Sequence, residues 1–150
     1  MGNRYCKKLA IAAQLGATHL INVTKEDLSN RISEITDGKG IDMALETSGA
    51  PVCFLQAVDS LAKGGKLSVI SFYESELNHL SIDKIVEKEL TISGAFGCYG
   101  IAEATKNILE ESHIDLTPII TYRVSFEQCL DVFLHQKEIK KNNIKVMVHF

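Results

Sequence analysis

Four short segments of small and polar residues follow apolar, β-rich stretches and could together form a ligand groove. They are residues 46–49 (ETSG), 70–72 (ISF), 94–96 (GAF) and the tip before Ile144 and Lys145. In an open parallel sheet, ligands bind beyond the carboxyl ends of the strands, where loops and helix N-termini present free backbone N–H groups. Any one of these segments alone is better explained as an ordinary turn. The glycine and serine residues in these segments would let a ligand lie against the backbone.

The cysteines and histidines show no spacing that would hold a metal ion. Cys6, Cys53, Cys98 and Cys129 are dozens of residues apart and form no CxxC pair, and the five histidines are equally scattered. We expect the cysteines to be small buried apolar residues. We expect the histidines to be surface or structural residues rather than ligands.

Length, charge and hydropathy exclude several classes of protein. The 150 residues are 45% hydrophobic and 23% charged, which suits one globular domain with a sizeable core. A net charge of −3 argues against nucleic-acid binding. No apolar run approaches the roughly 20 residues of a membrane span, and the N-terminus lacks the order of a signal peptide. We therefore expect a cytoplasmic protein without membrane association.

The elements that would position the four segments alternate regularly along the chain. Gly16 is a natural helix stop, Thr24 with Asp27 three residues later is the expected cap of the next helix, and Pro51 and Ser125 suit two further helix starts. This alternation of helices and strands predicts a parallel sheet with helices on both faces. The expected helices span residues 7–15, 24–35, 51–61, 82–87, 101–111 and 125–133, and the expected strands span residues 18–23, 41–46, 66–71, 89–94, 117–124 and 144–150.

Five stretches in this order resemble the medium-chain dehydrogenase/reductase family, and most of all its zinc-type alcohol, polyol and threonine dehydrogenases. They are KKLAIAAQLGATHLINV, EITDGKGIDMALETSGAP, LAKGGKLSVIS, EKELTISGAFG and a tail that begins PIITYRVSFEQCLDVF. The resemblance covers nearly the whole chain. It implies an α/β fold with a Rossmann-like, doubly wound, mostly parallel sheet that lacks the first strand and its Gly-rich turn.

The resemblance also implies a nicotinamide cofactor, NAD or NADP, and assigns residues to it. Thr47, Ser48 and Gly49 would approach the adenosine and its ribose, and Lys8 would line the adenine side. Lys145 would reach the pyrophosphate, where a cation is needed, although a solvated lysine at a strand edge is equally expected. The residues that would flank the nicotinamide ring are Ile70, Ser71, Phe72, Gly94, Ala95 and Phe96.

The dinucleotide fingerprint GxGxxG does not occur in this sequence, and residues 94–100 read GxxGxxG instead. In the family alignment the missing turn belongs before residue 1. The acidic residue that grips the ribose hydroxyls falls at Asn3, near the end of the family's second strand, and Arg4 follows it. Because an arginine could pair with a ribose phosphate, NADP is a hypothesis here, beside the alternative that these two residues have no specific role.

By this resemblance, residues 1–150 form a partial NAD(P)-binding domain with the family's C-terminal tail, and the catalytic zinc domain is absent. The family's zinc ligands come from that other domain, so neither a zinc ligand nor a catalytic residue is named in this chain. The missing strands would be the middle of the sheet. The strands at 18–23 and 41–46 must then pair with each other or with another chain, or the monomer is unstable.

The sequence and the resemblance leave three alternative functions open. The first is the cofactor-binding portion of a zinc-type alcohol or polyol dehydrogenase, which oxidises a secondary alcohol to a ketone or runs the reverse, and which is inactive as an isolated chain. Its partner would be the missing catalytic half or another copy of the chain. The second is a non-catalytic dimerisation or assembly module that uses the stretch PIITYRV or SGAFGCYG. The third is a domain that binds another nucleotide-containing ligand in the same groove.

Overall fold

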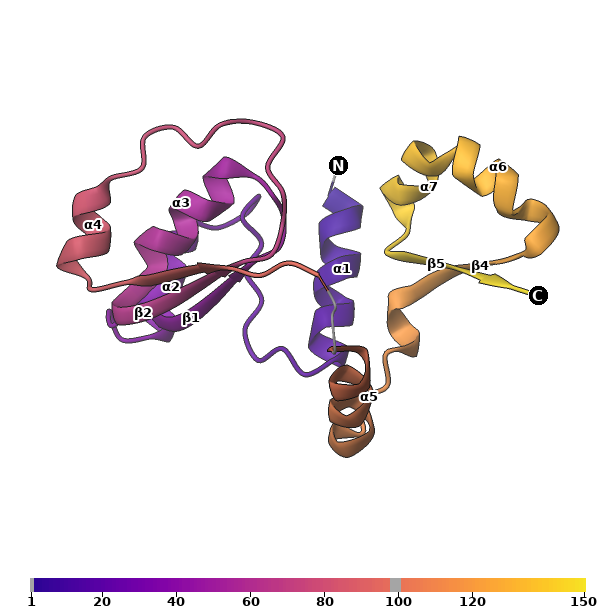
Figure 1. The fold of residues 1–150 in the computed structure, drawn as a ribbon, viewed down its shortest axis with the longest axis horizontal. Coiled ribbons are helices and arrows are strands. Elements are labelled where there is room, and N and C mark those ends of the chain that lie inside the picture. Colours follow the sequence, from indigo (N-terminus) through magenta and orange to yellow (C-terminus); the bar gives the residue numbers. More distant parts are fainter. Residues whose placement is uncertain (1, 98–100) are drawn as a thin grey trace. The chain divides into compact units, whose positions relative to one another are not determined.

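The computed structural model of the chain describes residues 2–97 and 101–150, with side chains from residue 6 onward (Figure 1). The chain divides into two compact units. The first contains residues 23–99, and the second combines residues 1–22 with residues 100–150. Within the described residues, no helix is both long and apolar enough to cross a bilayer.

The unit of residues 23–99 is a three-stranded parallel sheet with its connecting helices. The strand order is β1-β2-β3, so each strand lies beside the next one in the sequence, after a helical crossover. Figure 1 shows the segment between β2 and α4 arching past α3. The elements are α2 (Leu28–Ile35), β1 (Ile41–Glu46), α3 (Pro51–Ser60), β2 (Leu61–Val69), α4 (Ile82–Glu87) and β3 (Thr91–Gly94).

The core of this unit lies between α3 and the sheet. Phe54 and Val58 are four residues apart on α3, so they share one face of the helix, and both are buried against Leu61 and Leu67 of β2. Pro51 occupies the first turn of α3, as expected. The apolar contact between α3 and β2 holds α3 against the sheet.

Two helix ends in this unit are stabilised by side chains. Asp27, rather than the expected Thr24, caps α2, because its carboxylate accepts a hydrogen bond from the Asn30 N–H at 2.8 Å. The Lys88 amine donates to the backbone carbonyls of Asp59 and Leu61, both at 2.8 Å, and so satisfies carbonyls at the carboxyl end of α3.

The described residues of the other unit form a two-stranded parallel sheet, in which β4 pairs with β5, together with four α-helices and two 3-10 helices. The expected helix start at Ser125 is confirmed, since its N–H donates to the Gln128 side chain at 3.1 Å. Helix α7 has no counterpart among the expected elements. The elements are α1 (Gly2–Gln14), α5 (Ile101–Ser112), η1 (Thr117–Ile119), β4 (Ile120–Ser125), η2 (Phe126–Gln128), α6 (Cys129–Leu134), α7 (Gln136–Asn142) and β5 (Lys145–His149).

The expectation of parallel α/β structure is confirmed, but the predictions for residues 18–23 and for the cysteines are wrong. Residues 18–23 form no strand, because β1 and β2 pair with each other and residues 18–23 join no ladder within the described structure. The described cysteines are not buried: Cys6 is exposed, and Cys53 and Cys129 are half-buried. Cys98 lies outside the described residues.

Candidate functional site

A hollow of about 270 Å³ lies at the carboxyl ends of β2 and β3. The two strands are parallel and in register, with Val69 opposite Gly94, so their ends lie level with each other. The Ala95 N–H donates to the Val69 carbonyl at 2.9 Å and continues the ladder one residue beyond the strand. The lining residues are Val69, Ile70, Ser71, Phe72, Gly94, Ala95 and Phe96.

Two exposed phenyl rings line this hollow. Phe72 is 81% exposed and Phe96 is 88% exposed, and their ring centroids are 5.4 Å apart at an angle of 69°. This edge-to-face pair leaves aromatic surface available to a planar ligand. Gly94 adds room, because a Cβ placed on it would meet no atom within 4 Å. The hollow therefore fits a planar ring laid against strand ends.

The loop after β1 touches the loop after β2 through their backbones. Gly49 has φ +70°, and a Cβ there would lie 2.3 Å from the Phe72 carbonyl oxygen. Only glycine allows both this left-handed conformation and this close approach. The structure thus places Thr47, Ser48 and Gly49 next to the loop that carries Phe72.

The carboxylate of Glu46 joins the same two loops. Glu46 is only 4% exposed, and it accepts hydrogen bonds from the Ser48 N–H at 2.8 Å, the Ser48 hydroxyl at 2.5 Å and the Gly49 N–H at 3.2 Å. The Tyr73 hydroxyl donates to its other oxygen at 2.5 Å. A buried carboxylate that is fully hydrogen-bonded in this way has no unsatisfied acceptor.

These bonds determine how Glu46 and Tyr73 titrate. Burial by itself raises the pKa of Glu46, but the hydrogen bonds from Ser48, Tyr73 and Gly49 outweigh it, and the pKa lies below its usual value. Burial raises the pKa of Tyr73, and the bond to the Glu46 carboxylate raises it further. At neutral pH, therefore, an ionised carboxylate faces a neutral phenol.

The sequence placed Glu46 at the start of the candidate segment 46–49 but assigned it no role, and it did not single out Tyr73. A local signal existed for Glu46, since a carboxylate followed by a Ser-Gly pair can accept hydrogen bonds from the next turn. No pattern could reveal Tyr73, which is 27 residues further along the chain.

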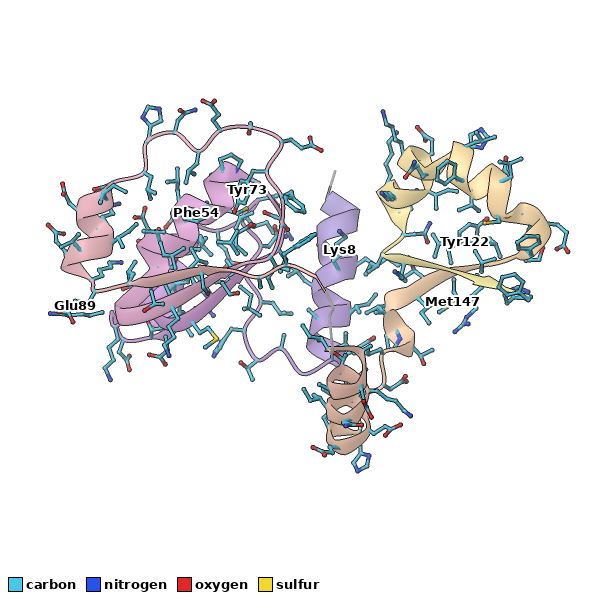
Figure 2. The ribbon with its side chains drawn as sticks, viewed as in Figure 1. Lys8, Phe54, Tyr73, Glu89, Tyr122 and Met147 are labelled. Atoms are coloured by element: carbon cyan, nitrogen blue, oxygen red, sulfur yellow. The ribbon has the colours of Figure 1, made fainter. Side chains whose placement is uncertain are left out.

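The remaining cofactor candidates belong to the other unit. Lys8 is exposed on α1 (Figure 2), and Lys145 is exposed at the start of β5. Asn3 and Arg4 lie inside α1, and their side chains are outside the described part. The expectation that Asn3 ends a strand is wrong, because a helix satisfies its own backbone groups without a neighbouring strand.

Comparison with known proteins identifies the family. The family model for zinc-binding dehydrogenases matches residues 4–113. This chain belongs to that zinc-binding dehydrogenase family.

Relatives of this zinc-binding dehydrogenase chain include sorbitol dehydrogenase of Bacillus subtilis, 30% identical over 95% of the chain and 40% of that protein. L-threonine 3-dehydrogenase of Aeromonas hydrophila is 36% identical over 83% of the chain and 37% of that protein. Among solved structures, 2R,3R-butanediol dehydrogenase of B. subtilis superimposes with a TM-score of 0.82 at 25% identity, over 97% of this chain and 41% of that one. The chain thus spans about 40% of the length of its relatives and matches their C-terminal part.

The expected resemblance to zinc-type alcohol, polyol and threonine dehydrogenases is confirmed by these comparisons. The family name raises the question of zinc. Among the described residues, no group of three or more His, Cys, Asp or Glu side chains could hold a metal ion. The described residues therefore do not fit a zinc centre, whereas the hollow fits a planar ring.

Proposed function

We propose that this chain forms the nicotinamide-cofactor-binding portion of a zinc-type alcohol or polyol dehydrogenase. The hollow at the ends of β2 and β3 carries this proposal. It lies where ligands bind in open parallel α/β sheets, and exposed aromatic rings and a glycine line it. Membership of the zinc-binding dehydrogenase family supports the same ligand.

In this proposal, each group of residues has a role in binding. Phe72 and Phe96 pack against the nicotinamide ring, while the backbone at residues 70–71 and 94–95 supports its edge. Thr47, Ser48 and Gly49 approach the adenosine side, and Lys8 and Lys145 supply positive charge for the adenine side and the pyrophosphate. A bound nicotinamide supplies a hydride acceptor or donor for interconversion of a secondary alcohol and a ketone.

We further propose that the zinc chemistry resides in the portion of such enzymes that this chain does not match. The 150-residue chain alone is then expected to bind cofactor without oxidising sorbitol, threonine or 2,3-butanediol. Turnover of any of these alcohols by the purified chain, with added zinc and NAD or NADP, would contradict this division of roles.

Cofactor binding is tested by titrating the chain with NADH and with NADPH and following nicotinamide fluorescence. Phe96→Ala removes one wall of the hollow and should raise the dissociation constant two- to tenfold, since an aromatic pair contributes about 0.5–1.5 kcal/mol. Phe126→Ala, an exposed phenylalanine of the other unit, is the matched control and should leave binding unchanged. An unsubstituted chain that binds neither dinucleotide refutes the proposal.

The choice between NAD and NADP is a second part of the proposal. We propose NADP, because Asn3 replaces the expected acidic residue and Arg4 could pair with the ribose phosphate. The chain should then bind NADPH more tightly than NADH, and Arg4→Ala should remove the difference. Tighter binding of NADH would contradict this choice.

One observation favours the alternative of an assembly module. Phe126 and Phe150 are exposed and stack on each other with centroids 5.2 Å apart, while Leu130, Phe133 and Leu134 of α6 are each 68% exposed. Exposed apolar side chains in such numbers mark interaction surfaces. A concentration-dependent dimer in sedimentation equilibrium, combined with no binding of NADH or NADPH, would favour this function over cofactor binding.

A further inference from the structure

The buried carboxylate of Glu46 joins two loops, one of which carries Phe72 of the hollow. Its donors come from two loops that are separate in sequence: Ser48 and Gly49 follow β1, and Tyr73 follows β2. Tyr73 is the residue after Phe72, whose ring lines the hollow. Any force that fixes the Tyr73 side chain therefore also restricts the backbone that carries Phe72.

The Tyr73 side chain is held at both ends. Its hydroxyl donates to the Glu46 carboxylate at 2.5 Å, and its ring packs edge-on against Phe54, with centroids 6.4 Å apart at 79° (Figure 2). Phe54 belongs to the buried core of the unit. The loop that carries Phe72 is thus anchored both to the core and to the loop of residues 47–49.

The close contact at Gly49 makes this arrangement sensitive to small shifts. Gly49 donates its N–H to the Glu46 carboxylate, and a Cβ on it would clash with the Phe72 carbonyl oxygen. A movement of either loop by a fraction of an ångström changes this contact. The carboxylate therefore bridges two loops that leave no room for a side chain at Gly49.

We propose that Glu46 and Tyr73 are positioning residues of the hollow, and that the hydrogen bond between them holds Phe72 where its ring can pack against a nicotinamide. This inference rests on the proposed function. Without the bond, the loop must be ordered when the ligand binds, and that ordering lowers the affinity. Neither residue has to touch the ligand.

Tyr73→Phe is the sharpest variant, because it removes the hydroxyl and keeps the ring that packs on Phe54. Glu46→Gln is the second variant, and Tyr122→Phe on β4 of the other unit is the matched control. Each chain is titrated with NADH and with NADPH. Tyr73→Phe and Glu46→Gln should raise the dissociation constant about tenfold and move the nicotinamide emission maximum toward its value in free solution, whereas Tyr122→Phe should change neither.

These readouts separate positioning from a purely structural role. Loss of stability alone raises the apparent dissociation constant only by the reciprocal of the folded fraction, which circular dichroism measures, and it leaves the emission maximum of the bound nicotinamide unchanged. An unchanged constant and an unchanged maximum in Tyr73→Phe would overturn the inference.

Hydrogen exchange of the chain without ligand distinguishes failure of this inference from failure of the proposed function. Tyr73→Phe should accelerate exchange in segments 46–50 and 70–74 while segment 62–68, within β2, keeps its rate. If the unsubstituted chain binds neither dinucleotide, the proposed function fails, and the inference as a statement about ligand binding fails with it. If it binds them and exchange in the two loops is unaffected, the anchoring role alone is refuted.

Discussion

Adding one methyl group at Gly49 tests how closely this residue approaches the Phe72 carbonyl. Gly49→Ala introduces two penalties. A residue with a Cβ in the left-handed region costs about 1–2 kcal/mol, and the backbone shift needed to relieve a 2.3 Å contact costs about 1–3 kcal/mol more. We therefore expect Gly49→Ala to lower the free energy of unfolding by about 2–5 kcal/mol.

Gly64 provides the matched control for this experiment. Its φ of +75° is close to the +70° of Gly49, but a Cβ on Gly64 would meet no atom within 4 Å. Gly64→Ala should therefore lower the free energy of unfolding by the conformational penalty alone, about 1–2 kcal/mol. The difference between the two variants isolates the contact between the loops.

The assay is urea unfolding of each variant followed by circular dichroism, together with an NADH titration. Gly49→Ala should also weaken NADH binding, because relief of the clash moves the loop that carries Phe72, whereas Gly64→Ala should bind NADH like the unsubstituted chain. Equal losses of stability in the two variants would refute the close approach of the loops.

Two further predictions concern stability. Lys88→Met should lower the free energy of unfolding by about 1.5–3 kcal/mol, because it leaves carbonyls at the end of α3 without their charged donor. The control Lys63→Met breaks an exposed ion pair with Glu89 and should lower the free energy of unfolding by less than about 1 kcal/mol. Thermal melts of both variants check this. Since the pKa of Glu46 is lower in the folded chain than its usual 4.5, its contribution to stability is present above about pH 4.5 and is lost as the pH falls through the folded value. Melts between pH 7 and pH 3 should show a shallower acid loss in Glu46→Gln, and an identical slope would contradict the prediction.

The lining of the hollow was predictable because it depends on local sequence. Apolar, β-rich segments ending in small residues at 70–72 and 94–96 predict strand ends, and parallel neighbours bring those ends to one edge of the sheet. The structure places these six residues around one hollow. The partnership of Glu46 with Tyr73 could not be predicted in the same way, because it depends on where the segment of residues 70–81 crosses α3.

The two wrong predictions at residues 18–23 and at Asn3 share one physical cause. An apolar, β-rich segment has the composition of a strand, but a strand also needs a neighbour to satisfy its backbone groups. Within the described residues, β1 pairs with β2 alone, and residues 18–23 join neither. Around Asn3 the backbone forms the first turns of α1 instead, because a helix needs no partner for its hydrogen bonds.

The same requirement explains why the hollow does form. Its two walls follow the ends of β2 and β3, which lie side by side. Each strand satisfies backbone hydrogen-bonding groups of the other, as the bond from the Ala95 N–H to the Val69 carbonyl illustrates. The backbone groups of β1, which ends at Glu46, are hydrogen-bonded to β2 in turn. The Ile70 N–H, for example, donates to the Glu46 carbonyl at 2.9 Å. Among the described residues, the contacts that join the walls of the hollow thus lie within residues 41–96. Substitution of Lys8 or Lys145 in the other unit should therefore lower the affinity for NADH through the adenine and pyrophosphate contacts proposed for them, and leave the emission maximum of bound NADH unchanged.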